Sequence, residues 1–298
     1  MRWYFWIMLS LIGLWAAASM AQNAVDAEVL EHQKKGIALF KERKYAEAIA
    51  EFQAFLSADS TNVQVLYAVG VCYHNEKQYD KAMVYFRKVM AQDAAFTKAR
   101  RALAEALFAK ARGLLVKKKY KPALEGFLEA ASIDSLNARI VYHAGLAYAR
   151  MDRMEQAIDA YRKATEMDTA YAPPNAALGR IFLKKEAYPQ AIKYLERALA
   201  IDHRIPKVPD NLTVAYERMA YTYTQKGSYT KATQAALESL KYDPGNMAAR
   251  VALGEAYEGL GKVEEAIEQY EIAKADLMWQ QYVEDRIKRL TKTDEDTE

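Results

Sequence analysis

Cysteine, proline and glycine are scarce in this chain of 298 residues, which has one Cys, 7 Pro and 12 Gly. A single thiol excludes an intrachain disulfide. Few helix breakers combined with abundant Ala, Leu, Lys and Glu favour helix over sheet, because straight side chains lose little rotamer freedom in a helix. The composition therefore predicts an all-α protein. We interpret Cys72, which has apolar neighbours, as a small buried hydrophobe.

The chain also lacks a strong excess of one charge and any pattern typical of an enzyme. The 42 Lys and Arg residues stand against 39 Asp and Glu residues, whereas nucleic-acid binding normally needs a marked basic excess. The few histidines are scattered, and no His-Glu-x-x-His, Gly-x-Ser-x-Gly or phosphate-binding glycine-rich pattern occurs. We therefore predict no nucleic-acid partner, no catalytic residues, no metal site and no cofactor.

The first 21 residues differ in kind from the rest. Arg2 precedes an apolar run over 3–18, and Ser19-Met20-Ala21 follows it. A positive start, an apolar middle and small residues before the cut describe a secretory signal peptide. We expect cleavage after Ala21, with a cut after Ala18 as the alternative, and hence export, most simply to a periplasm without membrane insertion of the mature chain. An uncleaved anchor in the inner membrane is the competing interpretation, although the apolar run is shorter than the roughly 20 residues that span a bilayer.

The remainder of the chain repeats itself. Equivalent alanines follow one another in steps of 34, 41, 34, 34, 41 and 34 residues: Ala48, Ala82, Ala123, Ala157, Ala191, Ala232 and Ala266. A glycine or alanine stands twelve residues before each of them, and an aromatic or other apolar residue stands three before. Such periodicity is typical of stacked repeats that bury a core only together.

These columns resemble the tetratricopeptide repeat, a helix–turn–helix unit of 34 residues. Its units are 29–62, 63–96, 104–137, 138–171, 172–205, 213–246 and 247–280. The resemblance implies a right-handed α-solenoid of antiparallel helix pairs over residues 22–290. We predict a capping helix that ends at 290, with Leu277, Val283, Ile287 and Leu290 on its apolar face, and an acidic tail over 291–298.

Two insertions of seven residues interrupt the repeats. Residues 97–103 contain no helix breaker and predict a helix lengthened by two turns, whereas 206–212 contain Pro206 and Pro209 and predict a flexible loop. An aspartate recurs near the end of most repeats, at Asp59, Asp93, Asp134, Asp168, Asp202 and Asp243. Because stacking separates these side chains by a whole repeat, we predict that they satisfy free backbone amides and do not surround a metal ion.

Function then rests on binding. By the resemblance, partners lie in the concave groove lined by the first helix of each repeat. The candidate protein-binding residues are Ile37, Phe40, Tyr67, Val71, His74, Phe108, Arg112, Arg139, Tyr142, Leu146 and Arg180. Aromatic and arginine side chains are typical of interface hot spots, but tyrosine here could equally serve packing. In the last two repeats the groove turns acidic, with Glu217, Glu255 and Glu258.

We therefore predict a non-catalytic scaffold or adaptor of the cell envelope that binds a protein or peptide. A regulatory or targeting subunit of an envelope enzyme complex is the alternative. An RNA-binding helical-repeat protein is a third interpretation, which export and the near-neutral charge disfavour.

Overall fold

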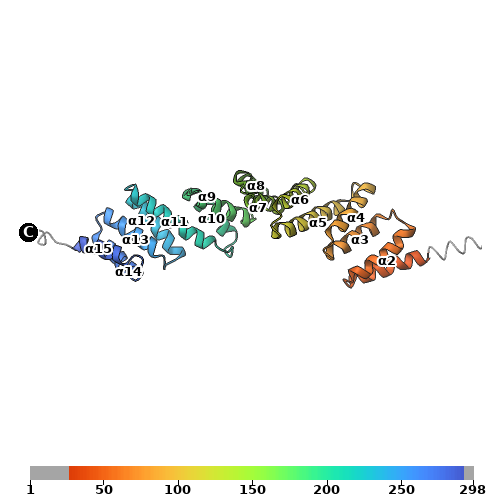
Figure 1. Ribbon diagram of the computed structural model, residues 1–298, viewed down its shortest axis with the longest axis horizontal. Helices are drawn as coiled ribbons and strands as arrows, with labels where there is room; N and C mark the ends of the chain where they lie inside the picture. The colour runs from red at the N-terminus through yellow and green to blue at the C-terminus, as the bar shows by residue number, and fades with distance from the viewer. Residues whose placement is uncertain (1–26, 292–298) are drawn as a thin grey trace, which may run out of the picture. The chain divides into compact units, whose positions relative to one another are not determined.

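In the computed structural model, residues 27–291 are described, and this part consists of α-helices and short turns with no strand. The chain divides into two compact units, one up to Met151 and one from Asp152 (Figure 1). The first unit holds a helix over 27–41, then α2 Tyr45–Ala58, α3 Val63–Asn75, α4 Tyr79–Gln92, α5 Thr97–Val116, α6 Tyr120–Ile133 and α7 Ala138–Arg150. The second holds α8 Met154–Met167, α9 Ala172–Lys184, α10 Tyr188–Ile201, α11 Val208–Gln225, α12 Tyr229–Tyr242, α13 Met247–Gly259, α14 Val263–Ala273 and α15 Gln280–Thr291.

The prediction of an all-α repeat fold is confirmed. The segments assigned to the signal peptide and the acidic tail lie outside the described residues, apart from Thr291.

The helices of a pair approach closely because glycine faces a large side chain across the pair. A Cβ atom added to Gly70 would lie 2.6 Å from the ring of Phe86, and one added to Gly179 would lie 2.5 Å from Cγ of Leu195. Real Cβ atoms essentially never come so close, so the repeat needs a small residue at this position. The opposing alanine column is equally tight, since Ala82 and Ala191 are fully buried.

Each turn inside a pair ends the first helix with a left-handed residue. The residues with positive φ at this place are Arg43, Lys77, Lys118, Asp152, Glu186, Gly227 and Gly261. A left-handed residue after a helix allows its last carbonyl groups to accept hydrogen bonds. The bond from the Gln78 N–H to the Tyr73 carbonyl, at 2.9 Å, is one example. The turn therefore closes through backbone bonds even where the residue is not glycine.

The first insertion is helical, which confirms its prediction, and the second is helical from Val208 onward after a turn at 206–207, which corrects its prediction. Residues 97–103 lengthen α5, where Ala99 and Leu103 are buried. Residues 206–212 are not a loop, because α11 starts at Val208. Pro209 stands in its first turn, where a missing N–H costs nothing. Val208 and Leu212 lie one helical turn apart and are both buried, so the core favours the helix.

The recurring aspartates end the second helices and hold the turns between repeats. Carboxylates of Asp93, Asp168 and Asp202 each accept a hydrogen bond from the backbone N–H two residues on, at 2.9 Å. Asp59 also accepts hydrogen bonds from Thr61 and Asn62, and these bonds lower the pKa of its carboxyl. The prediction that these aspartates satisfy backbone amides is confirmed for all but Asp134, which accepts a hydrogen bond from the Asn137 side chain.

Helix α15 covers the end of the second unit. Val283 is fully buried against Val251 and Tyr270, and Ile287 and Leu290 pack beside it. The prediction that Leu277 shares this face is wrong, since Leu277 is 87% exposed in the turn before α15. The helix starts only at Gln280, and Trp279 packs on the cluster in place of Leu277.

Candidate functional site

The candidate binding residues of the first unit lie on the first helix of successive repeats. Helices α3, α5 and α7 adjoin one another in this unit, so residues from alternate helices share a surface. This surface, which we call the α3–α5–α7 surface, comprises Val71, His74, Glu105, Arg112, Arg139, Tyr142 and Leu146. Arg180 is exposed on α9 and belongs to the second unit.

A hollow of about 210 Å³ lies at the α3 end of this surface. Val71 and His74 of α3 line it together with Ala102 and Glu105 of α5, and the buried ring of Phe86 also lines it. Two of the predicted residues thus meet at one depression. Burial lowers the pKa of His74, against the opposing effect of the Glu105 charge. Its buried Nε2 atom has no hydrogen-bond partner within residues 27–291.

Arg139 links α7 to α5 beside this hollow. Its guanidinium donates to both carboxylate oxygens of Glu105, at 2.8 and 3.0 Å. The same guanidinium lies 4.6 Å from the centre of the Phe108 ring, and that of Arg112 lies 5.8 Å from it. The cation–π contact and the charge-assisted hydrogen bonds from Nη2 both restrict a side chain that would otherwise be mobile. Two arginines and one glutamate leave this part of the surface net positive.

Phe108 is not the accessible binding residue that the sequence predicts. Only 2% of Phe108 is exposed, and its ring packs on Phe127 and His143 at centroid distances of 5.7 and 4.8 Å. A partner therefore cannot reach this ring directly. Phe108 supports Arg112 and Arg139 from below, and Leu103 and Leu107 of α5 belong to the same buried cluster.

His143 was not predicted, although it contacts Arg139 and Tyr142 of this surface. Its Nδ1 lies 2.9 Å from the Arg139 carbonyl oxygen, and Tyr142 meets its ring edge to face at 5.2 Å. Burial lowers the pKa of His143, and the charges of Arg112 and Arg139 act in the same direction. Its position between two predicted residues was the only signal in the sequence.

Of the remaining predicted residues of the first unit, one is exposed and two pack against other aromatic rings. Ile37 is 43% exposed, whereas Phe40 packs edge to face on Tyr45 at 5.8 Å. Tyr67 is half-buried between Phe86 and Phe96. Its ring therefore serves packing at least as much as binding.

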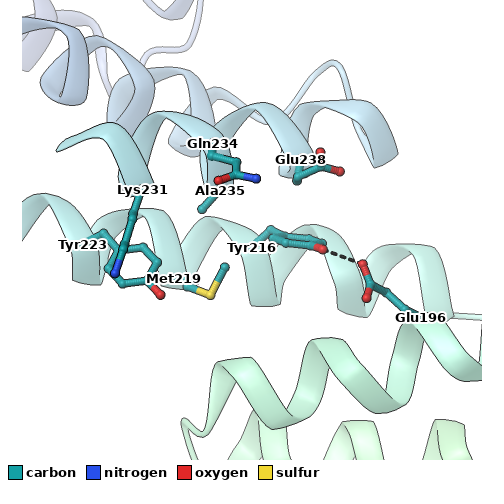
Figure 2. A pocket seen from close by; sticks show the side chains of 8 residues that line it. All are labelled: Glu196, Tyr216, Met219, Tyr223, Lys231, Gln234, Ala235 and Glu238. Atoms are coloured by element: carbon teal, nitrogen blue, oxygen red, sulfur yellow. Dashed lines mark hydrogen bonds between the residues drawn. The ribbon is translucent and has the colours of Figure 1, made fainter. Parts of the chain in front are cut away.

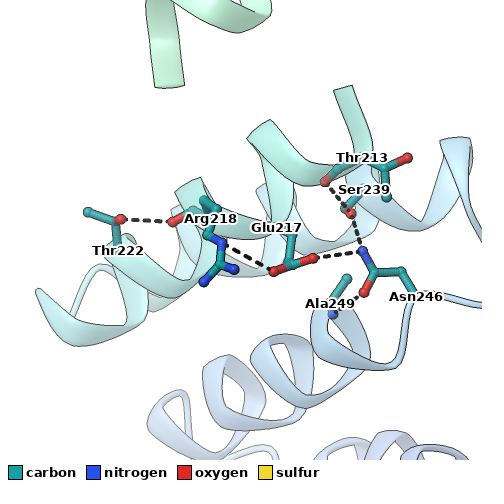
Figure 3. Close-up of polar contacts among 7 residues, drawn as sticks. All are labelled: Thr213, Glu217, Arg218, Thr222, Ser239, Asn246 and Ala249. Atoms are coloured by element: carbon teal, nitrogen blue, oxygen red, sulfur yellow. Dashed lines mark hydrogen bonds and ion pairs between the residues drawn. The ribbon is translucent and has the colours of Figure 1, made fainter. Parts of the chain in front are cut away.

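The acidic groove residues of the last repeats are engaged within the chain. Glu217 accepts a hydrogen bond from Asn246 at 3.1 Å, while Asn246 caps α13 by accepting from the Ala249 N–H (Figure 3). Ser239 donates to the Thr213 carbonyl in the same network, which joins α11, α12 and α13. Glu255 and Glu258 form ion pairs with Arg286 of α15. We therefore assign these glutamates to the fold.

Neither a metal-binding cluster nor a reactive cysteine occurs within the described residues. No group of three or more His, Cys, Asp or Glu residues suited to a metal ion occurs within 27–291. Cys72 is fully buried, and burial raises the pKa of its thiol to about 12, which keeps it protonated and unreactive. No helix in the same range is long and apolar enough to cross a membrane.

Comparison with known families agrees with this geometry. Tetratricopeptide repeat models match residues 34–96, 138–171, 176–208 and 218–277. The chain belongs to the tetratricopeptide repeat family. Its tight glycine–aromatic contacts and recurring left-handed turns are the physical counterpart of that match.

Curated relatives share this repeat region only in part. The chain is 23% identical over 206 residues to the DnaJ homolog subfamily C member 7 homolog of Dictyostelium discoideum, covering 66% of this chain and 38% of that protein. It is 28% identical over 165 residues to the BBSome complex member BBS4 of Bos taurus, covering 54% of this chain and 30% of that protein. The chain thus spans well under half the length of these relatives.

Solved structures with similar helix pairs include MamA, with a TM-score of 0.44, 22% identity and coverage of 58% of this chain and 96% of that one. YrrB, described as a TPR protein with an unusual peptide-binding site, gives a TM-score of 0.45 and 22% identity, and the match covers 67% of this chain and 97% of YrrB.

Proposed function

We propose that this protein is a non-catalytic interaction scaffold, and that the α3–α5–α7 surface binds a segment of a partner protein. The observation that carries the proposal is the hollow at Val71 and His74, beside two arginines that rest on Phe108. An apolar depression beside cations suits a peptide that carries an apolar side chain followed by an acidic one. The tetratricopeptide fold itself supports a protein or peptide partner.

The proposal is tested first by locating the partner. A photo-reactive amino acid at Val71 should cross-link one protein in cells, identified by mass spectrometry. The same probe at Glu47, which is exposed on the second helix of its pair, serves as the control. Equal capture of that protein from both positions would contradict the assignment of the surface.

Variants then measure the contribution of the surface to affinity. Val71→Glu places a charge at the hollow and Arg112→Glu reverses a charge, so together they should weaken the identified partner by at least about 2 kcal/mol, since hot spots concentrate binding energy in few residues. Glu47→Ala with Lys81→Ala is the matched pair on second helices. Normal binding by the surface variants, with an unchanged circular dichroism spectrum, would show that the partner binds elsewhere.

We also propose that the scaffold acts outside the cytoplasm, in the cell envelope. The arginine, apolar run and small residues before position 22 support this placement. N-terminal sequencing of the protein from fractionated cells should find Gln22 as the first residue. An intact Met1 in the membrane fraction would favour the anchored alternative.

A further inference from the structure

The second unit contains a cavity unlike the α3–α5–α7 surface. Its volume is about 480 Å³, and Figure 2 shows how its walls are built. Tyr216, Met219 and Tyr223 line it from α11, Glu238 lies on α12, and Glu196 comes from α10. The cavity therefore combines an aromatic and thioether wall with two carboxylates.

The carboxylates concentrate negative charge at one end of this cavity. The Tyr216 hydroxyl donates a hydrogen bond to Glu196 at 2.6 Å. Burial raises the pKa of Tyr216, and the charges of Glu196 and Glu238 raise it further. Glu238 pairs with Lys241, whereas Glu196 makes no ion pair within residues 27–291. Lys231 lies at the other end, with its ammonium 5.8 Å from the Tyr223 ring.

The first unit contains a cavity at the same place in the repeat, and there an arginine pairs with the glutamate of the next repeat. This cavity, of about 390 Å³, is lined by residues of α4, α5 and α6. Arg87 occupies in its repeat the position of Glu196, and Glu129 occupies that of Glu238. The Arg87 guanidinium donates to Glu129 at 2.7 Å. The second unit thus has a carboxylate where the first supplies a guanidinium to the neighbouring glutamate.

We propose that the α10–α11–α12 cavity, lined by Glu196, Tyr216, Met219, Tyr223 and Glu238, binds an arginine side chain of a protein partner. The guanidinium takes the place that Arg87 fills in the first unit, donates to Glu196 and Glu238, and rests its apolar stem on Met219 and Tyr223. Guanidinium groups pair with carboxylates through several donors and stack on aromatic rings, which fits both kinds of wall. The site is independent of the α3–α5–α7 surface and serves a basic, not an acidic, segment.

The test uses two capped tripeptides, leucine–arginine–leucine and its leucine–citrulline–leucine counterpart. Citrulline keeps the shape of arginine and removes its charge. At millimolar concentration the arginine peptide should shift the backbone amide signals of Tyr216, Met219 and Tyr223 in NMR spectra of the whole protein. The citrulline peptide should bind at least about fivefold more weakly, because charge-assisted hydrogen bonds are roughly twice as strong as neutral ones. Equal binding of both peptides, or no shift at these residues, would overturn the proposal.

Two variants assign the binding to the carboxylates. Glu196→Gln with Glu238→Gln keeps the size of both side chains and an acceptor for Tyr216, and should reduce affinity for the arginine peptide by about tenfold. Glu129→Gln, at the equivalent position of the first unit, should leave affinity unchanged. Thermal melts followed by circular dichroism establish that each variant is folded. Retained affinity in the double variant, or an equal loss in Glu129→Gln, would refute the assignment.

Discussion

Gly254 allows the closeness of the helix pairs to be tested quantitatively. A Cβ atom at this position would lie 2.5 Å from Cε1 and 2.8 Å from Cδ1 of Tyr270. The Tyr270 ring cannot move aside at low cost, because it is fully buried and its hydroxyl donates to Glu258 at 3.0 Å. Gly254→Ala therefore forces a clash between α13 and α14.

Two opposing effects set the magnitude. Alanine gains about 0.8–1.0 kcal/mol over glycine in a helix interior. Overpacking a tight contact costs about 1–3 kcal/mol, and we expect the upper half of that range because both ring contacts are shorter than real Cβ atoms allow. The free energy of unfolding should thus fall by about 1–2 kcal/mol. Gly113→Ala is the matched control, since nothing lies within 4 Å of its added Cβ in α5, and it should stabilise the protein by about 1 kcal/mol.

Equilibrium urea unfolding, followed by circular dichroism, measures both variants. A double-mutant cycle isolates the contact, because in a Tyr270→Ala background the clash is gone and Gly254→Ala should become stabilising. The reasoning is refuted if Gly254→Ala is as stable as Gly113→Ala. It is equally refuted if the effect of Gly254→Ala is the same with and without the Tyr270 ring.

Two further predictions follow from burial. The pKa values of His74 and His143 are lowered in the folded state, so the unfolded chain binds protons more tightly, and stability should fall as pH drops through the ordinary histidine value of 6.5. Urea unfolding at neutral and acidic pH should show a smaller loss of stability for the double variant His74→Gln, His143→Gln than for the parent protein. An equal loss in both would contradict the role of these two histidines. Val283→Ala truncates a fully buried side chain of α15 and should lower the free energy of unfolding by about 1–3 kcal/mol. Met278→Ala, at an 80% exposed residue, should change it by less than about 0.5 kcal/mol in the same urea assay. Equal stability of both variants would mean that α15 does not cap the core.

The candidate surface was only partly predictable from the repeat register. The register placed Val71, His74 and Arg139 on first helices. In the structure Val71 and His74 line one hollow, and Arg139 donates to Glu105, which lines the same hollow. It could not show that Phe108 is buried, because that burial depends on contacts with Phe127 of α6 and His143 of α7. The meeting of Glu196 and Glu238 at one cavity was equally hidden, since these glutamates belong to different repeats and share a cavity only when the repeats stack.

The sequence by itself determined the helix pairs of this protein. The alternation of small residues such as Gly70 and Gly179 with large ones such as Phe86 and Leu195 encodes a local contact within one repeat, which sequence spacing fully describes. Only the tertiary structure decided the conformation of the insertion before α11 and the residue at which α15 starts. Proline predicts a loop at 206–212, but Pro209 falls in the first turn of α11, where helix tolerates it, and Val208 and Leu212 are buried in the core of the second unit. Trp279 takes the core position that the apolar pattern assigns to Leu277.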